Sequence, residues 1–142
     1  MSTLKTLSTR KRSAVKRTTA VTPKSKLLKA IIKAIQEKKG EHIVSLDLRK
    51  IPEAAADFFI ICEATSSTQV RAIAEHIDMQ IKENCNEMPY RKEGLQTSQW
   101  ALIDYVNIVV NIMQPAIRNF YQLEEMWNDA TIQKHEQLII DN

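Results

Sequence analysis

The apolar run over residues 58–62 most constrains what this chain can fold into. It reads Phe-Phe-Ile-Ile-Cys, with no polar side chain in five positions. Such a run is typical of a strand that is covered on both faces of its sheet. The segment Thr65–Ser67 follows closely and is rich in residues that cap helix N-termini. The sequence therefore predicts a strand–turn–helix unit at the centre of the fold.

Three more segments carry clear periodic patterns. Apolar residues at positions 28, 31, 32 and 35 recur with the spacing of one helix face, and Ser25 is a suitable N-cap for that helix. Alternation over residues 41–48 indicates a half-buried strand. The helix after the central turn has apolar residues at 70, 73, 74, 77 and 81, so it also predicts one buried face.

The C-terminal half predicts a hairpin and a last helix. A short extended piece between Pro89 and Gly94 precedes two β-rich runs, 100–105 and 108–113. So few residues separate the two runs that a hairpin is their natural connection. Pro115 suits the first turn of a helix, and residues 117–127 supply the apolar side of that helix.

The order of these elements predicts an α/β fold. At least one connection is a hairpin and another is a helical crossover, so we expect a mixed β-sheet of about five strands layered by helices. A chain of 142 residues fits one domain. We expect a disordered basic arm over residues 1–25, the folded domain over 26–129 and a C-terminal tail over 130–142.

Charge is distributed unevenly along the chain. Residues 1–26 hold eight basic side chains and no acidic one, whereas residues 27–142 hold 12 basic and 17 acidic side chains. Three interpretations of the basic arm remain open: a solvated tail with weak attraction to RNA, a functional tether to an RNA-rich partner, and an organellar transit peptide. The arm lacks an amphipathic apolar stripe, which counts against the third.

Composition and spacing disfavour several functional classes. No stretch approaches the roughly 18 apolar residues of a membrane helix. Two cysteines cannot build a disulfide framework, and two glycines cannot build a P-loop or a dinucleotide fingerprint. We therefore expect a reduced, intracellular and soluble domain.

No group of residues predicts catalysis or metal binding. The histidines at 42, 76 and 135 have no second His or Cys at ligand spacing. Asp47 and Asp104 stand alone on their strands, whereas metal-assisted phosphoryl transfer uses clustered carboxylates. Cys62 belongs to the apolar central run, which indicates a buried thiol. We expect neither an enzyme nor a metal or cofactor.

The first strand of the hairpin combines aromatic and apolar residues. Alternation places residues 100, 102 and 104 (Trp, Leu, Asp) on one face and residues 101, 103 and 105 (Ala, Ile, Tyr) on the other. One face must meet the helices. The other face, if it is incompletely covered, offers Trp or Tyr, which are enriched at interface hot spots. The same pattern also fits two core aromatics, so the pattern alone leaves both interpretations open.

Two separated blocks of sequence point to a known family. The first consists of Asp57–Cys62, Thr65–Ser67, Val70 and Ala72–Ala74. The second consists of Trp100, Leu102, Asp104, Tyr105, Ile108–Val110, Arg118, Phe120, Tyr121, Leu123, Glu124 and Trp127. Together these blocks resemble the ribosomal silencing factor family, also called the Iojap family. The resemblance spans roughly residues 26–129, in the family's order and with plausible spacing.

The resemblance implies a fold similar to that of nucleotidyltransferases, without a known transferase activity. It implies a factor that binds the large ribosomal subunit at the large-subunit ribosomal protein numbered fourteen, on the face that meets the small subunit. Occupying that face blocks subunit joining and represses translation, chiefly when nutrients are scarce. Family members often form homodimers when isolated, which suggests the same for this chain when free.

The resemblance also implies a contact surface, centred on Trp100. We extend it along the same strand to Leu102, Asp104 and Tyr105. An aromatic anchor with a flanking carboxylate suits a basic ribosomal protein. In the arm, the candidate contacts to ribosomal RNA are Arg10, Lys11, Arg12, Lys16 and Arg17.

Two residues depart from the family's pattern. Val106 stands where the family commonly has Gly, and Asn111 stands where it often has His. A β-branched residue resists the positive φ of a tight hairpin turn, so we expect Asn107 to take that conformation.

Two other functions compete with the silencing hypothesis. One is an RNA-binding or ribosome-assembly module that uses the basic arm, and the other is a nucleotidyltransferase-type enzyme. The expected compartment is the bacterial cytoplasm, with an organelle (the mitochondrion) as the alternative.

Overall fold

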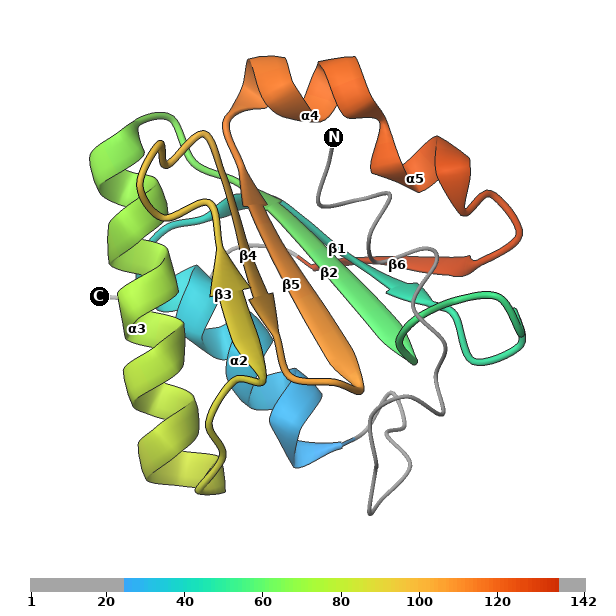
Figure 1. The fold of residues 1–142 in the computed structure, drawn as a ribbon, viewed down its shortest axis with the longest axis horizontal. Coiled ribbons are helices and arrows are strands. Elements are labelled where there is room, and N and C mark those ends of the chain that lie inside the picture. Colours follow the sequence, from blue (N-terminus) through green and yellow to red (C-terminus); the bar gives the residue numbers. More distant parts are fainter. Residues whose placement is uncertain (1–24, 136–142) are drawn as a thin grey trace, which may run out of the picture.

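A six-stranded mixed sheet forms the centre of the molecule (Figure 1). The computed structural model describes residues 25–135. The strands are β1 (Glu41–Asp47), β2 (Phe58–Glu63), β3 (Arg91–Glu93), β4 (Trp100–Asp104), β5 (Ile108–Met113) and β6 (Thr131–His135). Their order across the sheet is β3-β4-β5-β2-β1-β6, and only β2 and β5 pair in parallel. The predicted mixed α/β sheet is confirmed.

Two long helices cover one face of the sheet. They are α2 (Lys26–Glu37) and α3 (Ser67–Cys85), which pack against each other. Ser25 caps α2 as predicted, because its Oγ accepts a hydrogen bond from the Leu28 amide at 3.1 Å. Ser66 caps α3 in the same way through the amide of Gln69. The apolar faces predicted for both helices are buried in one core cluster with the strands.

The opposite face is covered by shorter elements. These are α4 (Pro115–Tyr121), α5 (Leu123–Met126) and the connection between β1 and β2. Trp127 packs edge-on against Phe59 of β2, with ring centroids 6.0 Å apart. The run 58–62 is therefore buried on both faces, as the sequence predicted. In Figure 1, α4 and α5 lie along the upper margin of the sheet.

The sheet has six strands where the sequence analysis expected about five. The additional strand is β6, which falls within the predicted C-terminal tail and pairs antiparallel with β1. His135 completes it with a 2.8 Å hydrogen bond between its Nε2 and Ser45 Oγ. The side chains of the first four β6 residues are exposed, so the strand is held by backbone pairing and shows no apolar alternation.

The β4–β5 hairpin is confirmed, but its turn differs from the expectation. Val106, and not Asn107, has the positive φ, at 73°. The Asn107 amide donates to the Tyr105 carbonyl at 2.9 Å, which makes Val106 the centre of a rare three-residue turn. Asp104 supports this turn, because its Oδ1 accepts from the Val106 amide at 2.8 Å.

Candidate functional site

Trp100 lies at the start of β4 and points away from the α2–α3 layer. Its ring packs in the cluster under α4 and α5, and part of it stays accessible to solvent. The indole Nε1 donates a hydrogen bond to Asn111 Oδ1 at 3.0 Å. Asn111 is fully buried on β5, and its Nδ2 donates to the Ile60 carbonyl at 3.4 Å. The neighbouring strand therefore fixes the orientation of this ring.

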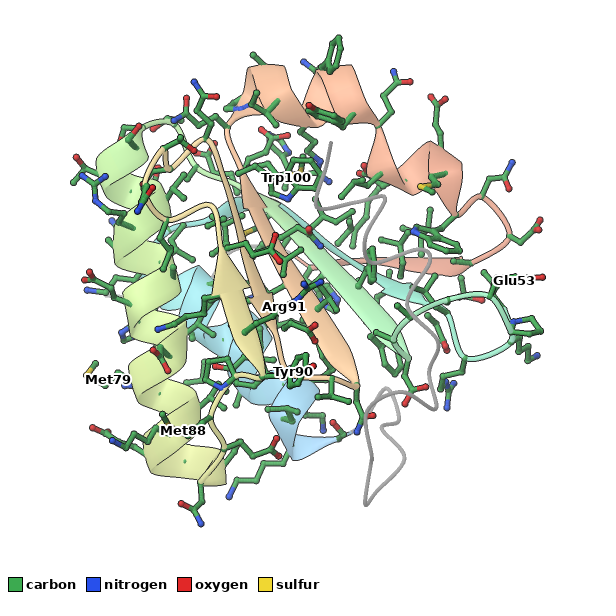
Figure 2. All side chains as sticks on the ribbon, in the orientation of Figure 1. Glu53, Met79, Met88, Tyr90, Arg91 and Trp100 are labelled. Carbon is green, nitrogen blue, oxygen red and sulfur yellow. The ribbon has the colours of Figure 1, made fainter. Side chains whose placement is uncertain are left out.

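Two aromatic residues of α4 extend the surface that begins at Trp100. The Tyr121 ring lies 4.9 Å from the Trp100 ring between centroids, and Phe120 lies 4.9 Å from Tyr121 at an interplanar angle of 83°. Phe120 is 78% exposed. We call Trp100, Phe120 and Tyr121 the aromatic ledge. Figure 2 shows Trp100 beneath α4, at the start of this ledge.

The start of α4 is fixed to the rest of the fold. Gln114 is its N-cap residue and Pro115 occupies the first turn, which confirms the prediction for this proline. The Gln114 side chain donates to Ser67 Oγ at 3.2 Å and to the Ser98 carbonyl at 3.1 Å. These bonds tie the N-terminal end of α4 to α3 and to the segment before β4.

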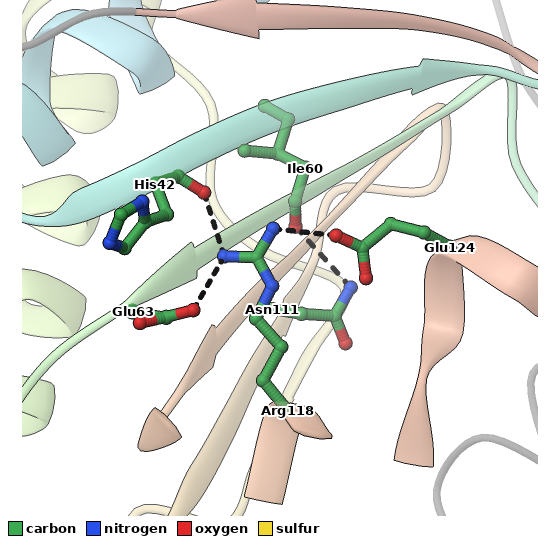
Figure 3. Close-up of polar contacts among 6 residues, drawn as sticks. All are labelled: His42, Ile60, Glu63, Asn111, Arg118 and Glu124. Carbon is green, nitrogen blue, oxygen red and sulfur yellow. Dashed lines mark hydrogen bonds and ion pairs between the residues drawn. The ribbon is translucent and has the colours of Figure 1, made fainter. Parts of the chain in front are cut away.

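Arg118 anchors α4 from its other side (Figure 3). Its Nη1 donates to the His42 carbonyl at 2.7 Å and to Glu63 Oε2 at 3.3 Å, and its Nη2 donates to Glu124 Oε2 at 2.6 Å. His42 has a positive φ of 49° where the register between β1 and β2 shifts. One buried guanidinium thus joins β1, β2, α4 and α5.

The four predicted contact residues differ in accessibility. Trp100 retains exposed surface, whereas Leu102 and Asp104 are fully buried on the same face of β4. Tyr105 faces α2 and α3 in the other core cluster, where burial raises the pKa of its hydroxyl. Besides supporting the turn, Asp104 places Oδ2 at 3.5 Å from Nε of Arg91. The predicted RNA contacts, Arg10, Lys11, Arg12, Lys16 and Arg17, lie outside the described residues.

A pocket of about 880 Å³ opens beside Arg118 and is lined by residues of β1, β2, α4, α5 and β6. Its lining contains three carboxylates, of Glu41, Glu63 and Glu124, and two cations, of Arg118 and Lys134. Within residues 25–135, no group of three or more His, Cys, Asp or Glu side chains is arranged to hold a metal ion.

Cys62 is fully buried, and this burial raises the pKa of its thiol to about 12.

Comparison with known proteins identifies the family. A family model described as "Ribosomal silencing factor during starvation" matches residues 21–141. The chain belongs to the ribosomal silencing factor family. The factor of Halalkalibacterium halodurans is 38% identical over 104 residues, which cover 73% of this chain and 87% of the relative. The factor of Bacillus subtilis is 36% identical over 106 residues, which cover 75% of this chain and 88% of the relative.

Solved structures agree with this membership of the ribosomal silencing factor family. A protein from Chromobacterium violaceum superposes with a TM-score of 0.69 at 29% identity, covering 80% of this chain and 90% of that chain. A Bacillus halodurans protein superposes with a TM-score of 0.64 at 35% identity, covering 71% of this chain and 92% of that chain. Within residues 25–135, this silencing-factor chain has no helix long and apolar enough to cross a membrane.

Phe120 and Tyr121 were not among the contact residues predicted from the sequence. Both were predicted to lie on the apolar side of the last helix, and both belong to the second family block. The missing information was the position of α4 relative to β4, because residues 100 and 121 are neighbours only through the tertiary fold. The available signal was Phe-Tyr in a short helix, which cannot bury both rings against one sheet.

Proposed function

We propose that this chain binds the large ribosomal subunit by placing the aromatic ledge against the ribosomal protein numbered fourteen. The bound factor occupies the face that meets the small subunit, so it sterically blocks subunit joining and represses translation, chiefly under nutrient limitation. The observation that carries the proposal is Trp100, which is oriented by Asn111 and flanked by the exposed Phe120. Membership of the ribosomal silencing factor family supports it.

The ledge has the physical properties of a protein-binding anchor. Its rings supply apolar area at a small entropic cost, because packing and hydrogen bonding already restrict them. Truncating an anchor of this kind typically costs about 2–4 kcal/mol, or roughly 30- to 1,000-fold in affinity. The excess of acidic side chains over residues 27–142 adds long-range attraction to a basic ribosomal protein.

In this proposal the other predicted contact residues act on the ledge indirectly, through the fold of β4 and its turn. Leu102 fills the core beneath β4, and Asp104 holds the turn that joins β4 to β5. Tyr105 packs on the helices of the opposite face. Their replacement therefore acts on the binding of the subunit through the position of Trp100.

The mechanism requires no chemical turnover, and relatives are named as silencing factors, which are regulators.

Bacterial relatives favour a bacterial cytoplasmic location, and organellar relatives offer the alternative. One is "Mitochondrial assembly of ribosomal large subunit protein 1" of Mus musculus, 32% identical over 73 residues. Another is "Protein Iojap, chloroplastic" of Zea mays, 31% identical over 105 residues.

The test is co-sedimentation with purified large subunits at physiological salt. The wild-type chain is expected to migrate with the subunits and to prevent small subunits from joining them. Trp100→Ala is expected to lose both properties. Met88→Ala is the matched control, because Met88 is an exposed apolar residue on another part of the molecule (Figure 2).

Two results would contradict the proposal. If the wild-type chain does not migrate with large subunits, the silencing function is wrong for this protein. If Trp100→Ala binds as tightly as Met88→Ala, the contact does not involve the ledge, and the basic arm becomes the main candidate.

A further inference from the structure

A groove lined by lysines runs between α2 and α3, on the face of the sheet opposite to the aromatic ledge. Its volume is about 470 Å³. Helix α2 contributes Lys26, Lys29 and Lys33, whereas α3 contributes the amides of Gln80 and Asn84. We propose that this groove binds the phosphate backbone of RNA and is a second contact of the factor with the ribosome. The choice of RNA as the partner rests on the proposed function.

The three lysines form one row along the helix. They are three and four residues apart, so all three lie on one side of α2 over roughly 10 Å of its axis. All three are exposed. Within residues 25–135, no carboxylate forms an ion pair with Lys26, Lys29 or Lys33. The row therefore presents uncompensated positive charge.

The neighbouring polar groups offset only part of that charge. Glu37 is the one acidic residue lining the groove, against three lysines, and its carboxylate lies 2.8 Å from Nε2 of His76. On the facing helix, Asn84 Nδ2 donates to Gln80 Oε1 at 3.0 Å, so this wall offers neutral amides. A groove with one cationic wall and one neutral wall suits a phosphate backbone, because amides donate hydrogen bonds to phosphate oxygens.

The lysine row is electrostatically unfavourable for the free protein. The first turn of a helix favours acidic side chains because the amide groups there carry partial positive charge. The first turn of α2 contains no acidic residue and includes Lys26 and Lys29. Lys29 and Lys33 are also like charges four residues apart, which repel each other. A bound polyanion would relieve each of these repulsions.

More basic residues precede α2 in the sequence. Residues 1–24 hold seven basic side chains and no acidic one, and they lead directly into α2. From residue 1 to 39 the chain has 12 basic residues and one acidic residue, Glu37. The row in the groove therefore belongs to a segment of the sequence that is basic throughout.

The groove and the ledge can be occupied together. The sheet separates them, since α2 and α3 belong to one core cluster and Trp100 packs against the other (Figure 1). A ribosomal protein on the ledge therefore leaves the groove accessible. Substitutions in the two sites should have independent, additive effects on binding to the subunit.

The experiment measures binding of the full chain to a labelled oligouridine strand and to an RNA duplex, over a range of salt concentrations. The groove variant carries Lys26→Gln, Lys29→Gln and Lys33→Gln. The control variant carries Lys38→Gln, Lys50→Gln and Lys82→Gln, which removes the same charge from exposed positions outside the groove. Glutamine has nearly the helix propensity of lysine, so both variants should fold.

The groove variant is expected to bind RNA one to two orders of magnitude more weakly at physiological salt. The slope of log affinity against log salt should fall by roughly 2 on single-stranded RNA, from three lost phosphate contacts. The control variant should change both quantities much less. Preference for the strand or for the duplex identifies the form of RNA that the groove accepts.

Three outcomes would overturn the inference. Equal losses in the groove and control variants would show that only net charge matters. An unchanged affinity in the groove variant would assign RNA binding to residues 1–24. Tighter groove-dependent binding to phosphatidylserine vesicles than to RNA would assign the groove to a membrane surface.

A parallel assay separates this inference from the proposed function. Binding to the isolated ribosomal protein numbered fourteen should depend on Trp100 and be unaffected in the groove variant. Suppose that the wild-type chain does not bind that protein, but the groove variant still binds RNA more weakly than the wild type. The proposed function is then wrong, and the RNA-binding role of the groove stands. If the wild-type chain binds that protein but no RNA, the RNA-binding role of the groove is wrong and the proposed function stands.

Discussion

Trp100 and Asn111 are joined across the β4–β5 hairpin by a hydrogen bond of 3.0 Å from the indole Nε1 to the amide Oδ1. Asn111 lies opposite Leu102 in the strand register, so the indole reaches diagonally to the next pair along the hairpin. The Asn111 side chain is buried, and rotating the indole away would leave its amide oxygen without this partner. The bond therefore couples a core amide to the orientation of an exposed aromatic surface.

Removing the amide should weaken docking without removing the anchor. Asn111→Leu keeps the approximate volume and deletes the acceptor, so the ring of Trp100 is no longer fixed and its Nε1 lacks a partner. We expect about a tenfold lower affinity for large subunits, measured by co-sedimentation titration. Asn111→His, which retains an acceptor, should lose less. In a Trp100→Phe background, which has no donor, Asn111→Leu should have little further effect, and an equal effect there would refute the coupling.

Replacing Val106 should stabilise the protein. A β-branched residue at φ 73° stores roughly 1–3 kcal/mol of backbone strain, and glycine adopts this conformation freely. Glycine also raises the entropy of the unfolded chain, so the net gain of Val106→Gly should be about 1 kcal/mol. Urea denaturation followed by circular dichroism measures it. A lower free energy of unfolding in Val106→Gly would show that the turn is unstrained.

Removing the Arg118 guanidinium should destabilise the fold and detach α4. Arg118→Met leaves the His42 carbonyl and the largely buried Glu63 carboxylate without their donor. We expect a loss of about 2 kcal/mol in unfolding free energy, together with weaker docking through the displaced ledge. Arg118→Lys should recover little of either quantity, because an ammonium cannot donate in the same fork. Full recovery by lysine would show that charge alone matters.

Acid should weaken the attachment of β6. Burial lowers the pKa of His135, so the folded state binds this proton less readily than the unfolded state does. Its contribution to stability is therefore complete above pH about 6.5 and decreases as the pH falls below that value. The protection factors of the β6 amides, which are exchange rates corrected for the intrinsic pH dependence of exchange, should fall between pH 7 and 5. In His135→Gln this fall should be absent, and its persistence would assign the effect to another group.

The sequence predicted the parts of the fold that depend on buried apolar residues. The central run is apolar throughout, the hairpin consists of two β-rich runs, and the two long helices repeat apolar residues with the helical period, because each element packs one or two faces against the core. Trp100 was predicted as a contact residue from its place in a family block, and that role stays a prediction. The solvent accessibility of Trp100 was not predicted, because it depends on how far α4 covers β4.

The parts that were missed are held by interactions without a sequence period. Strand β6 is an edge strand with exposed polar side chains, and backbone pairing alone gives no apolar signal. The positive φ was expected at Asn107 because valine disfavours it. Two interactions instead hold Val106 in that conformation. The carboxylate of Asp104 accepts a hydrogen bond from the Val106 amide. The carbonyl of Asn107 accepts hydrogen bonds from the amides of Asp57 and Phe58.

The parallel pairing of β2 with β5 sets an order on the assembly of this molecule. The antiparallel pairs β1–β2 and β4–β5 join segments close in the chain, whereas β2 and β5 meet only after the intervening helix and strands have been made. Residues 120 and 121 of the ledge come later still. During synthesis, the complete ledge therefore forms only after β5 has paired with β2 and α4 has been made, so nearly the whole folded domain precedes it.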